Sequence, residues 1–310
     1  MKKVALTVAA LALTAGSALA ADLPSRKAPP MLPPPPPPPP MWTGFYVGLN
    51  AGGTWANSNH QTIAVAPVAF GNSFNPWIGS ARFNGEVAAL SSAASAGGFN
   101  GGNNGGFIGG GQIGYNWQFY NSFVAGVEAD IQGLTGNSGS RSFITAAPTG
   151  FGDSWIGVHS VRGNLDYLGT VRGRLGWLFT PTLLVYGTGG LAYGGVTLNT
   201  ASTVYNDTFS NFIAPAFGGV NFSNTQVGWT AGGGLEWMFW PNWSAKVEYL
   251  YYDLGTVTQN FAMPISVAGG FNDSALFAGQ ARARVNGNIV RAGVNYHFNW
   301  GAPAPVVAKY

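Results

Sequence analysis

The sequence predicts an all-β fold, an eight-stranded antiparallel transmembrane β-barrel with short turns at one end and long loops at the other. In residues 227–239 the odd positions are Val, Trp, Ala, Gly, Leu, Trp and Phe, and the even positions are Gly, Thr, Gly, Gly, Glu and Met, which gives a strand two different faces. Only 8% of the residues are charged, against about 25% in soluble domains. After the N-terminus no apolar run is long enough for a spanning helix, so a closed barrel is the natural way to satisfy the backbone in lipid.

The N-terminal residues have the pattern of a secretory signal peptide. Lys2 and Lys3 precede the apolar run 4–13, and Ala18-Leu19-Ala20 is a small-x-small cleavage site, so we expect residues 1–20 to be removed. The alternative, a membrane anchor, requires a longer apolar run. Loss of the two lysines lowers the net charge from +3 to +1, so the charge does not indicate a nucleic-acid partner.

A proline-rich segment, residues 21–41, comes next. Residues 33–40 are all proline, which favours polyproline II and makes a spacer of about 25 Å at about 3.1 Å per residue. Proline has no N–H to donate, so this run cannot enter the interior of a sheet. We interpret the segment as a stiff periplasmic leader, with a peptide-recognition segment as the alternative.

Eight segments then alternate in the manner of strands, and most are long enough for a tilted membrane crossing. The predicted strands are 42–55, 105–119, 122–134, 165–180, 183–198, 225–240, 243–257 and 285–300. The fifth, 183–198, has no clear phase because residues 183–186 are apolar on both faces. An even number of strands places both ends of the barrel on the periplasmic side.

The connections alternate strictly between short and long. Residues 120–121, 181–182 and 241–242 form tight turns, whereas the long connections are 56–104, 135–164, 199–224 and 258–284. The long connections are rich in Gly, Ser, Asn and Ala, so we expect them to be mobile loops that bury little surface. Short turns on one side and long loops on the other are typical of outer-membrane barrels.

The mid-strand charges all fall on the less aromatic face of their strands. They form the predicted lumen charge cluster: Glu128, Asp130, Arg172, Arg174, Glu236, Lys246, Glu248 and Arg291. Four acids and four bases can neutralise one another inside a closed barrel. A soluble barrel with this face in water would carry more charge. Two interpretations stay open: a salt-bridge plug, which we favour because eight strands leave little room, and the lining of a narrow ion path.

Aromatic residues gather at the strand ends beside the tight turns or the barrel termini. They include Phe45, Tyr115, Trp117, Phe119, Phe179, Trp237, Phe239, Trp243, Tyr296 and Phe298. Aromatic rings at these levels form the interfacial girdles of membrane barrels. The aromatic face is therefore expected to point to lipid.

Four motifs carry a resemblance to a known family: WTGFYVGLNAGG at 42–53, LGTVRGRLG at 168–176, YGTGGLAYG at 186–194 and VRAGVNYHFNW at 290–300. From residue 42 onward the chain resembles the small outer-membrane immunogenic, or porin-family, β-barrels of alphaproteobacteria, relatives of the OmpA transmembrane domain. The resemblance implies a Gram-negative outer-membrane barrel, exposed at the cell surface and often antigenic. Members are variously porins, structural proteins, or binders of haem and host molecules.

The resemblance also implies an assembly signal near the C-terminus. Many such barrels end on an aromatic residue that the outer-membrane assembly machinery reads, but here a tail, 301–310, follows the last strand. We therefore expect Tyr296 and Phe298 to be the barrel-assembly signal.

Residues for catalysis or metal binding are sparse. The histidines are His60, His159 and His297, and there is no cysteine. A grouping of Ser154, His159 and Asp153 means little, because catalytic triads are recognised by geometry. No metal-ligand spacing stands out, so no cofactor is predicted. Haem held between His60 and His159 is less favoured than two solvated loop histidines.

The sequence therefore predicts a non-enzymatic outer-membrane β-barrel protein, porin-like or structural. The alternative is a surface-interaction or ligand-binding protein that acts through its loops, and an outer-membrane enzyme is a distant third. The expected partners are the lipid bilayer, the assembly machinery, and small polar solutes or host ligands.

Overall fold

The computed structural model describes residues 42–57, 60–100, 105–136, 139–267 and 273–298. The predicted signal peptide (1–20), leader (21–41) and tail (301–310) lie outside the described residues. None of the helices in the described part of the chain is long and apolar enough to cross a membrane.

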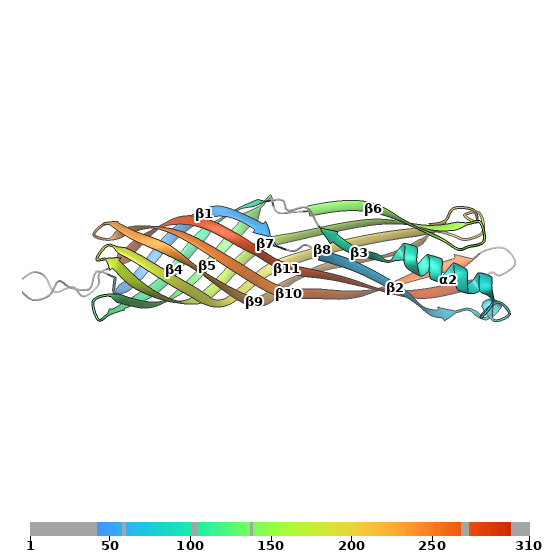
Figure 1. Ribbon diagram of the computed structural model, residues 1–310, viewed down its shortest axis with the longest axis horizontal. Helices are drawn as coiled ribbons and strands as arrows, with labels where there is room; N and C mark the ends of the chain where they lie inside the picture. The colour runs from blue at the N-terminus through green and yellow to red at the C-terminus, as the bar shows by residue number, and fades with distance from the viewer. Residues whose placement is uncertain (1–41, 58–59, 101–104, 137–138, 268–272, 299–310) are drawn as a thin grey trace, which may run out of the picture. The chain divides into compact units, whose positions relative to one another are not determined.

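Eight antiparallel strands form a closed ring (Figure 1). In ring order they are β1 (Gly44–Ala56), β4 (Gly106–Phe119), β5 (Phe123–Thr135), β7 (Ser154–Thr180), β8 (Leu183–Asn206), β9 (Ala216–Trp240), β10 (Trp243–Val267) and β11 (Asp273–Phe298). Pairing of β1 with β11, from Phe45 opposite Phe298 to Ala56 opposite Gly287, closes the ring. The predicted fold class is confirmed, and each strand end at the tight turns lies within one residue of its prediction.

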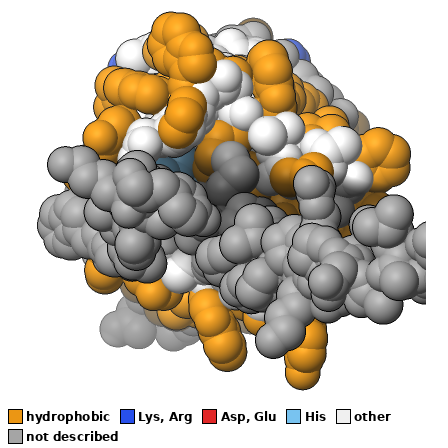
Figure 2. Space-filling view, turned by 90° about the vertical axis from the view of Figure 1, so that its left-hand side faces the viewer, with side chains coloured by type: hydrophobic (Ala, Val, Ile, Leu, Met, Phe, Trp, Pro, Cys, Tyr) orange, Lys and Arg blue, Asp and Glu red, His pale blue; other side chains and the backbone are white. Residues whose placement is uncertain are grey.

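The two faces of the ring differ as the alternation predicts. Outward side chains are apolar and exposed, for example Leu49 at 74% and Leu175 at 61%, whereas the intervening residues point inward and are mostly buried. The phase of β8 is now clear, since Leu184 and Tyr186 are buried while Val185 is exposed. Seen from the end with the tight turns, hydrophobic side chains surround the rim (Figure 2).

The prediction of long mobile loops at the other end is wrong. There β7 to β11 continue well past their predicted ends, and β2 (His60–Phe70), β3 (Ala96–Asn100) and β6 (Gly139–Pro148) add to the sheet. The sheet order at this end is β6-β7-β8-β9-β10-β11-β2-β3. We call this part the extension. It comprises β2, β3, β6, the helical residues 72–74 and 81–94 between β2 and β3, and residues 154–165, 196–226 and 257–283.

Two β-bulges interrupt the alternation of inward and outward residues at the base of the extension. Between Leu165 and Leu168, β7 has one residue more than its partner β8, and β10 has one more than β11 between Asp253 and Thr256. An extra residue reverses which face the following side chains occupy. In β10 the bulge contains Gly255 at φ +81°, a conformation that suits glycine. For this reason a simple period of two predicts strand ends at 165 and 257, where the strands in fact continue.

A helix covers the seam left open by the extension. No strand pairing joins β3 to β6 among the described residues, and α2 (Ala81–Ala94) packs against β2, β6 and β7 there. The helix follows a short 3₁₀ turn, η1 (Asn72–Phe74), and begins at Ser80, whose side chain accepts a hydrogen bond from the Phe83 N–H.

The inner face of α2 belongs to a hydrophobic core that fills the extension. Ala89, Leu90, Ala93 and Ala94 are buried in it, together with residues from β2 and β7 such as Ile63, Trp155 and Val161. Small residues that suggested a mobile loop instead let the helix approach the sheet closely.

A charge on this inner face should undock the helix. We expect Ala93→Glu to expose Arg82 to trypsin, because an unpaired buried carboxylate costs several kcal/mol. Ala88→Glu on the exposed face of the same helix is the matched control and should leave the cleavage rate within about twofold. Equal protection of both variants, with unheated samples migrating as folded barrels in SDS gels, would contradict this packing.

Candidate functional site

The eight predicted cluster residues lie together inside the barrel, contributed by five strands. They are Glu128 and Asp130 on β5, Arg172 and Arg174 on β7, Glu236 on β9, Lys246 and Glu248 on β10, and Arg291 on β11. Each is no more than 5% exposed. Register places acid opposite base on neighbouring strands, with Glu128 opposite Arg172, Lys246 opposite Glu236 and Glu248 opposite Arg291.

Arg172 is at the centre of the network. Its Nη1 lies 3.0 Å from Glu248 Oε1, and its Nη2 lies 2.8 Å from Asp130 Oδ2 and also pairs with Glu128. Its Nε donates to Thr170 Oγ1 at 2.9 Å. One guanidinium thus binds three carboxylates, a use of the planar fork that a lysine could not match.

Two further cations link the same carboxylates. Arg291 Nη2 lies 2.9 Å from Asp130 Oδ2 and 2.6 Å from Glu248 Oε2. Lys246 Nζ lies 3.1 Å from Glu128 Oε1. Glu128, Asp130 and Glu248 therefore each contact at least two cations, and the charges balance locally.

A second group lies nearer the tight turns. Arg174 Nη2 lies 2.6 Å from Glu236 Oε2, and the guanidinium carbon lies 4.6 Å from the ring centroid of Tyr186. Glu236 Oε1 also accepts from Ser244 Oγ at 2.6 Å, and that hydroxyl lies 2.9 Å from His297 Nε2. Ser244 therefore links His297 to Glu236.

Inward glycines make room for these long side chains. A Cβ at Gly114 would lie 2.4 Å from the hydroxyl oxygen of Tyr46, which donates to Glu128 Oε2 at 2.6 Å. The tyrosine therefore reaches the network only because residue 114 has no side chain.

Four buried apolar residues, which we call the apolar layer, border the network on the side of the extension and belong to the hydrophobic core that continues into it. Ile108, Leu168, Leu250 and Ile289 come from β4, β7, β10 and β11, and each is at most 1% exposed. Leu250 and Ile289 face each other in register.

His159 does not behave as the predicted solvated loop histidine. It is buried on β7, where Nδ1 lies 2.9 Å from Ser202 Oγ and Nε2 lies 3.0 Å from the Ala93 carbonyl oxygen. That carbonyl belongs to the last turn of α2 and also accepts from Thr145 Oγ1 at 2.5 Å. His159 and Thr145 therefore cap the C-terminal end of the helix.

These contacts leave the other predicted roles of the histidines without support. Both ring nitrogens of His159 are engaged within the protein, and Asp153 bonds Thr149 and Asn206 instead of His159. The strand of His60, β2, is not a sheet neighbour of β7, and the His60 side chain lies outside the described part of the structure. The Ser154–His159–Asp153 grouping is not assembled.

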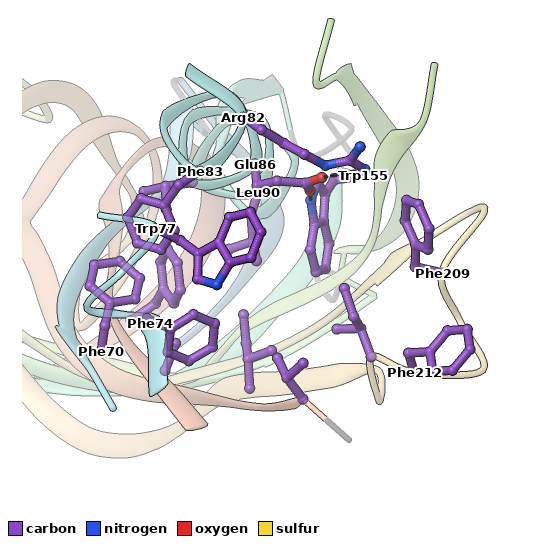
Figure 3. Close-up of a pocket in the computed structure, with 16 residues that line it drawn as sticks. Phe70, Phe74, Trp77, Arg82, Phe83, Glu86, Leu90, Trp155, Phe209 and Phe212 are labelled. Atoms are coloured by element: carbon purple, nitrogen blue, oxygen red, sulfur yellow. Dashed lines mark hydrogen bonds and ion pairs between the residues drawn. The ribbon is translucent and has the colours of Figure 1, made fainter. Parts of the chain in front are cut away.

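The extension contains an apolar pocket of about 600 Å³ that the sequence did not predict (Figure 3). Its walls come from α2, η1, β2, β7, β10, β11 and residues 209–213. Half of its sixteen lining residues are aromatic: Phe70, Phe74, Trp77, Phe83, Trp155, Phe209, Phe212 and Phe277. The sequence feature that could have indicated this pocket is the series of aromatic residues between Phe70 and Phe83, which lies in a connection predicted to be a loop.

Charged groups at the pocket are already partnered. Arg82 Nη2 lies 3.4 Å from Glu86 Oε1 and 3.6 Å from Asp153 Oδ1, and its guanidinium lies over the Phe209 ring at 5.2 Å. Trp155 Nε1 donates to Glu86 Oε2 at 2.8 Å. Burial raises the pKa of Glu86, although the hydrogen bond from Trp155 opposes that change.

Comparison with known proteins places the chain in a family. The model of the outer membrane protein beta-barrel domain matches residues 6–298. The chain belongs to this family. It is 34% identical to the 31 kDa outer-membrane immunogenic protein of Brucella melitensis over 96% of this chain and all of that protein. It is 32% identical to the 22 kDa outer membrane protein of Rhizobium leguminosarum over 46% of this chain and 52% of that protein.

This outer-membrane barrel also has distant structural neighbours. OprG from Pseudomonas aeruginosa matches 83% of this chain and 97% of its own at 10% identity, with a TM-score of 0.33, which is too low to bear on function. The resemblance seen in the sequence motifs is confirmed, and so is an outer-membrane location. That the tight turns face the periplasm and the extension faces the outside of the cell stays a prediction. The names of the Brucella and Rhizobium relatives describe no enzymatic activity.

The predicted assembly signal lies on the closing strand. Tyr296 is opposite Val47 on β1 and Trp243 on β10, and its ring contacts Trp243 and Phe298 at centroid distances of 5.2 and 5.1 Å. Recognition of these residues by the assembly machinery stays a prediction.

Removal of Arg172 should destabilise this barrel strongly. Arg172→Ala leaves three buried carboxylates with one cation fewer, and loss of one partner of a buried pair costs about 3–5 kcal/mol. The measurement is the free energy of unfolding in urea of protein refolded into lipid vesicles. Arg162→Ala, an exposed arginine on the same strand, should change it by no more than about 0.5 kcal/mol. Equal values for the two variants would refute a structural role of the network.

Docking of α2 should weaken in mild acid. Burial lowers the pKa of His159, partly offset by the hydrogen bond to the Ala93 carbonyl, whereas in the unfolded chain it is about 6.5. At a pH below about 6.5 the undocked, unfolded form therefore binds more protons at His159 than the folded form does. The free energy that favours the docked helix falls as the pH drops through this range. Hydrogen exchange of α2 amides, corrected for intrinsic rates, should accelerate from pH 7.5 to 5.5. His159→Gln should remove this acceleration; an identical pH profile in that variant would assign it to other groups.

Proposed function

We propose that this protein is a closed, non-conducting outer-membrane barrel that anchors and displays its folded extension at the cell surface. The observation that carries the proposal is the path of the ion pairs. Lys246 on β10 binds Glu128 on β5, which lies four places away around a ring of eight strands. The pair therefore spans the barrel from wall to wall.

Two more pairs cross the lumen in other directions. Arg172 on β7 binds Glu248 on β10, and Arg291 on β11 binds Asp130 on β5, three ring places apart in each case. Side chains that meet from opposite walls and exclude solvent fill the cross-section. This supports the salt-bridge plug over the ion path.

The apolar layer is a second obstacle to solutes. Ile108, Leu168, Leu250 and Ile289 offer no polar atom to a hydrated ion, and hydrophobic constrictions gate by dewetting. Polar solutes would therefore meet a charged barrier and an apolar barrier in series.

The packing of the extension supports a display role. Its core, the docked helix α2 and the cap from His159 and Thr145 hold a defined outer surface. A barrel that is only an anchor needs a stable interior, and the paired charges provide one.

The test is single-channel conductance of the full-length mature protein, refolded and inserted in a planar bilayer. We expect no discrete steps from folded wild-type protein. Glu128→Ala combined with Arg172→Ala removes an acid and a base together, which opens the charged barrier. The double variant should conduct ions unless the apolar layer alone blocks them. Val171→Ala, the neighbouring outward residue, is the matched control and should stay silent. Reproducible wild-type steps, altered by the double substitution, would overturn the proposal in favour of a porin.

A further inference from the structure

We propose that the apolar pocket in the extension binds a neutral aromatic small molecule. The inference does not depend on whether the barrel conducts, because the pocket lies beyond the ion-pair network and the apolar layer. It names a site and a ligand class that the family membership does not assign.

The shape of the pocket suits a small molecule. Its volume of about 600 Å³ falls within the range of about 300–1,000 Å³ for small-molecule sites. Its floor is closed by Leu90, Ile265 and Phe277, which are buried. A concave site with a closed floor accepts a compact ligand more readily than an extended polypeptide.

The lining favours an aromatic ligand. Phe70 already contacts Phe74, Phe83 and Phe277 edge to face, at centroid distances of 6.0, 4.9 and 6.1 Å. Such arrangements are favourable beyond their buried area, so a bound ring would meet further ring edges and faces. In Figure 3, Phe209 and Phe212 lie across the cavity from Phe70 and Phe74.

The charges favour a neutral ligand. Arg82 faces Glu86 and Asp153 at once, so an anion would compete with two carboxylates already in place. Glu86 uses its second oxygen to accept from Trp155, so a cation would have to displace an existing donor. Among the residues that line the pocket, one guanidinium, Arg82, offsets one carboxylate, Glu86, and both already have partners within the protein, so an ionic ligand would have to compete with them.

Exposed hydrophobic side chains at the mouth give a reason for a ligand. Trp77 and Phe212 are 50% and 58% exposed although they line the pocket. Contiguous apolar surface in water is costly and marks interaction sites. A bound aromatic molecule would cover the inner faces of both side chains.

The first experiment titrates N-phenyl-1-naphthylamine, a neutral aromatic probe, into the full-length mature protein in lipid nanodiscs. Probe fluorescence in empty nanodiscs is subtracted, and we expect saturable binding with one site per protein. Val87→Phe fills the pocket from α2 and should weaken binding at least tenfold. Ala88→Phe places the same ring on the exposed side of the helix and should change binding less than twofold. No saturable signal, or equal affinity in the two variants, would overturn the proposal.

A second pair of variants guards against misfolding of the first. Phe212→Ala removes an exposed ring at the mouth and should weaken binding severalfold. Phe217→Ala removes a similarly exposed ring that does not line the pocket and should leave binding unchanged. Competition then identifies the ligand class. Naphthalene should displace the probe more effectively than dodecanol or palmitate. Stronger displacement by either long-chain compound would refute an aromatic ligand, and stronger displacement by palmitate would also refute a neutral one.

Discussion

A sheet of eight strands in a bilayer must close on itself, since lipid offers no hydrogen bonds to an open edge, and closure leaves an interior that only side chains can fill. Charges in that interior have no solvent, so each must meet an opposite charge. Here Lys246, Arg172 and Arg291 do so by reaching across the ring. The network is thus a consequence of closure, and it also holds opposite walls of the barrel together.

Outside the membrane the same strands face a different problem. Because β1, β4 and β5 stop, the sheet acquires two edges, β3 and β6, and exposed edges invite pairing with other chains. Helix α2 covers this gap, and its last turn is capped by His159 from the sheet. The bulges in β7 and β10 supply the change of face that this arrangement needs. In β7 the even-numbered Arg172 points inward on one side of the bulge, and the odd-numbered His159 points inward on the other. The extra residue of the bulge accounts for this change of parity.

The barrel could be predicted from the sequence because a period of two extends over every membrane crossing except the fifth, whose first residues are apolar on both faces. Parity alone put Glu128 and Arg172 on the inner face. It could not identify Lys246 as a partner of Glu128, since that contact depends on ring size and the separation of strands in the barrel. The extension was missed for two reasons: the bulges interrupt the period, and small residues such as Ala93 and Ala94 suit a loop as well as a tightly packed helix. His159 was misplaced with it, because burial of a polar residue depends on partners far along the chain.

The order of the layers inside the protein has an electrostatic consequence. Ile108, Leu168, Leu250 and Ile289 keep the solvent of the extension away from one side of the ion pairs. Attraction between charges strengthens where water is excluded, and so does the penalty for leaving one of them unpaired. The apolar layer therefore makes a half-broken network more costly than it would be in a wet lumen. Opening of the barrel then requires two changes together, separation of charges that have no water to receive them and hydration of a hydrocarbon layer. This order of layers agrees with the proposed function, a closed barrel that anchors its extension.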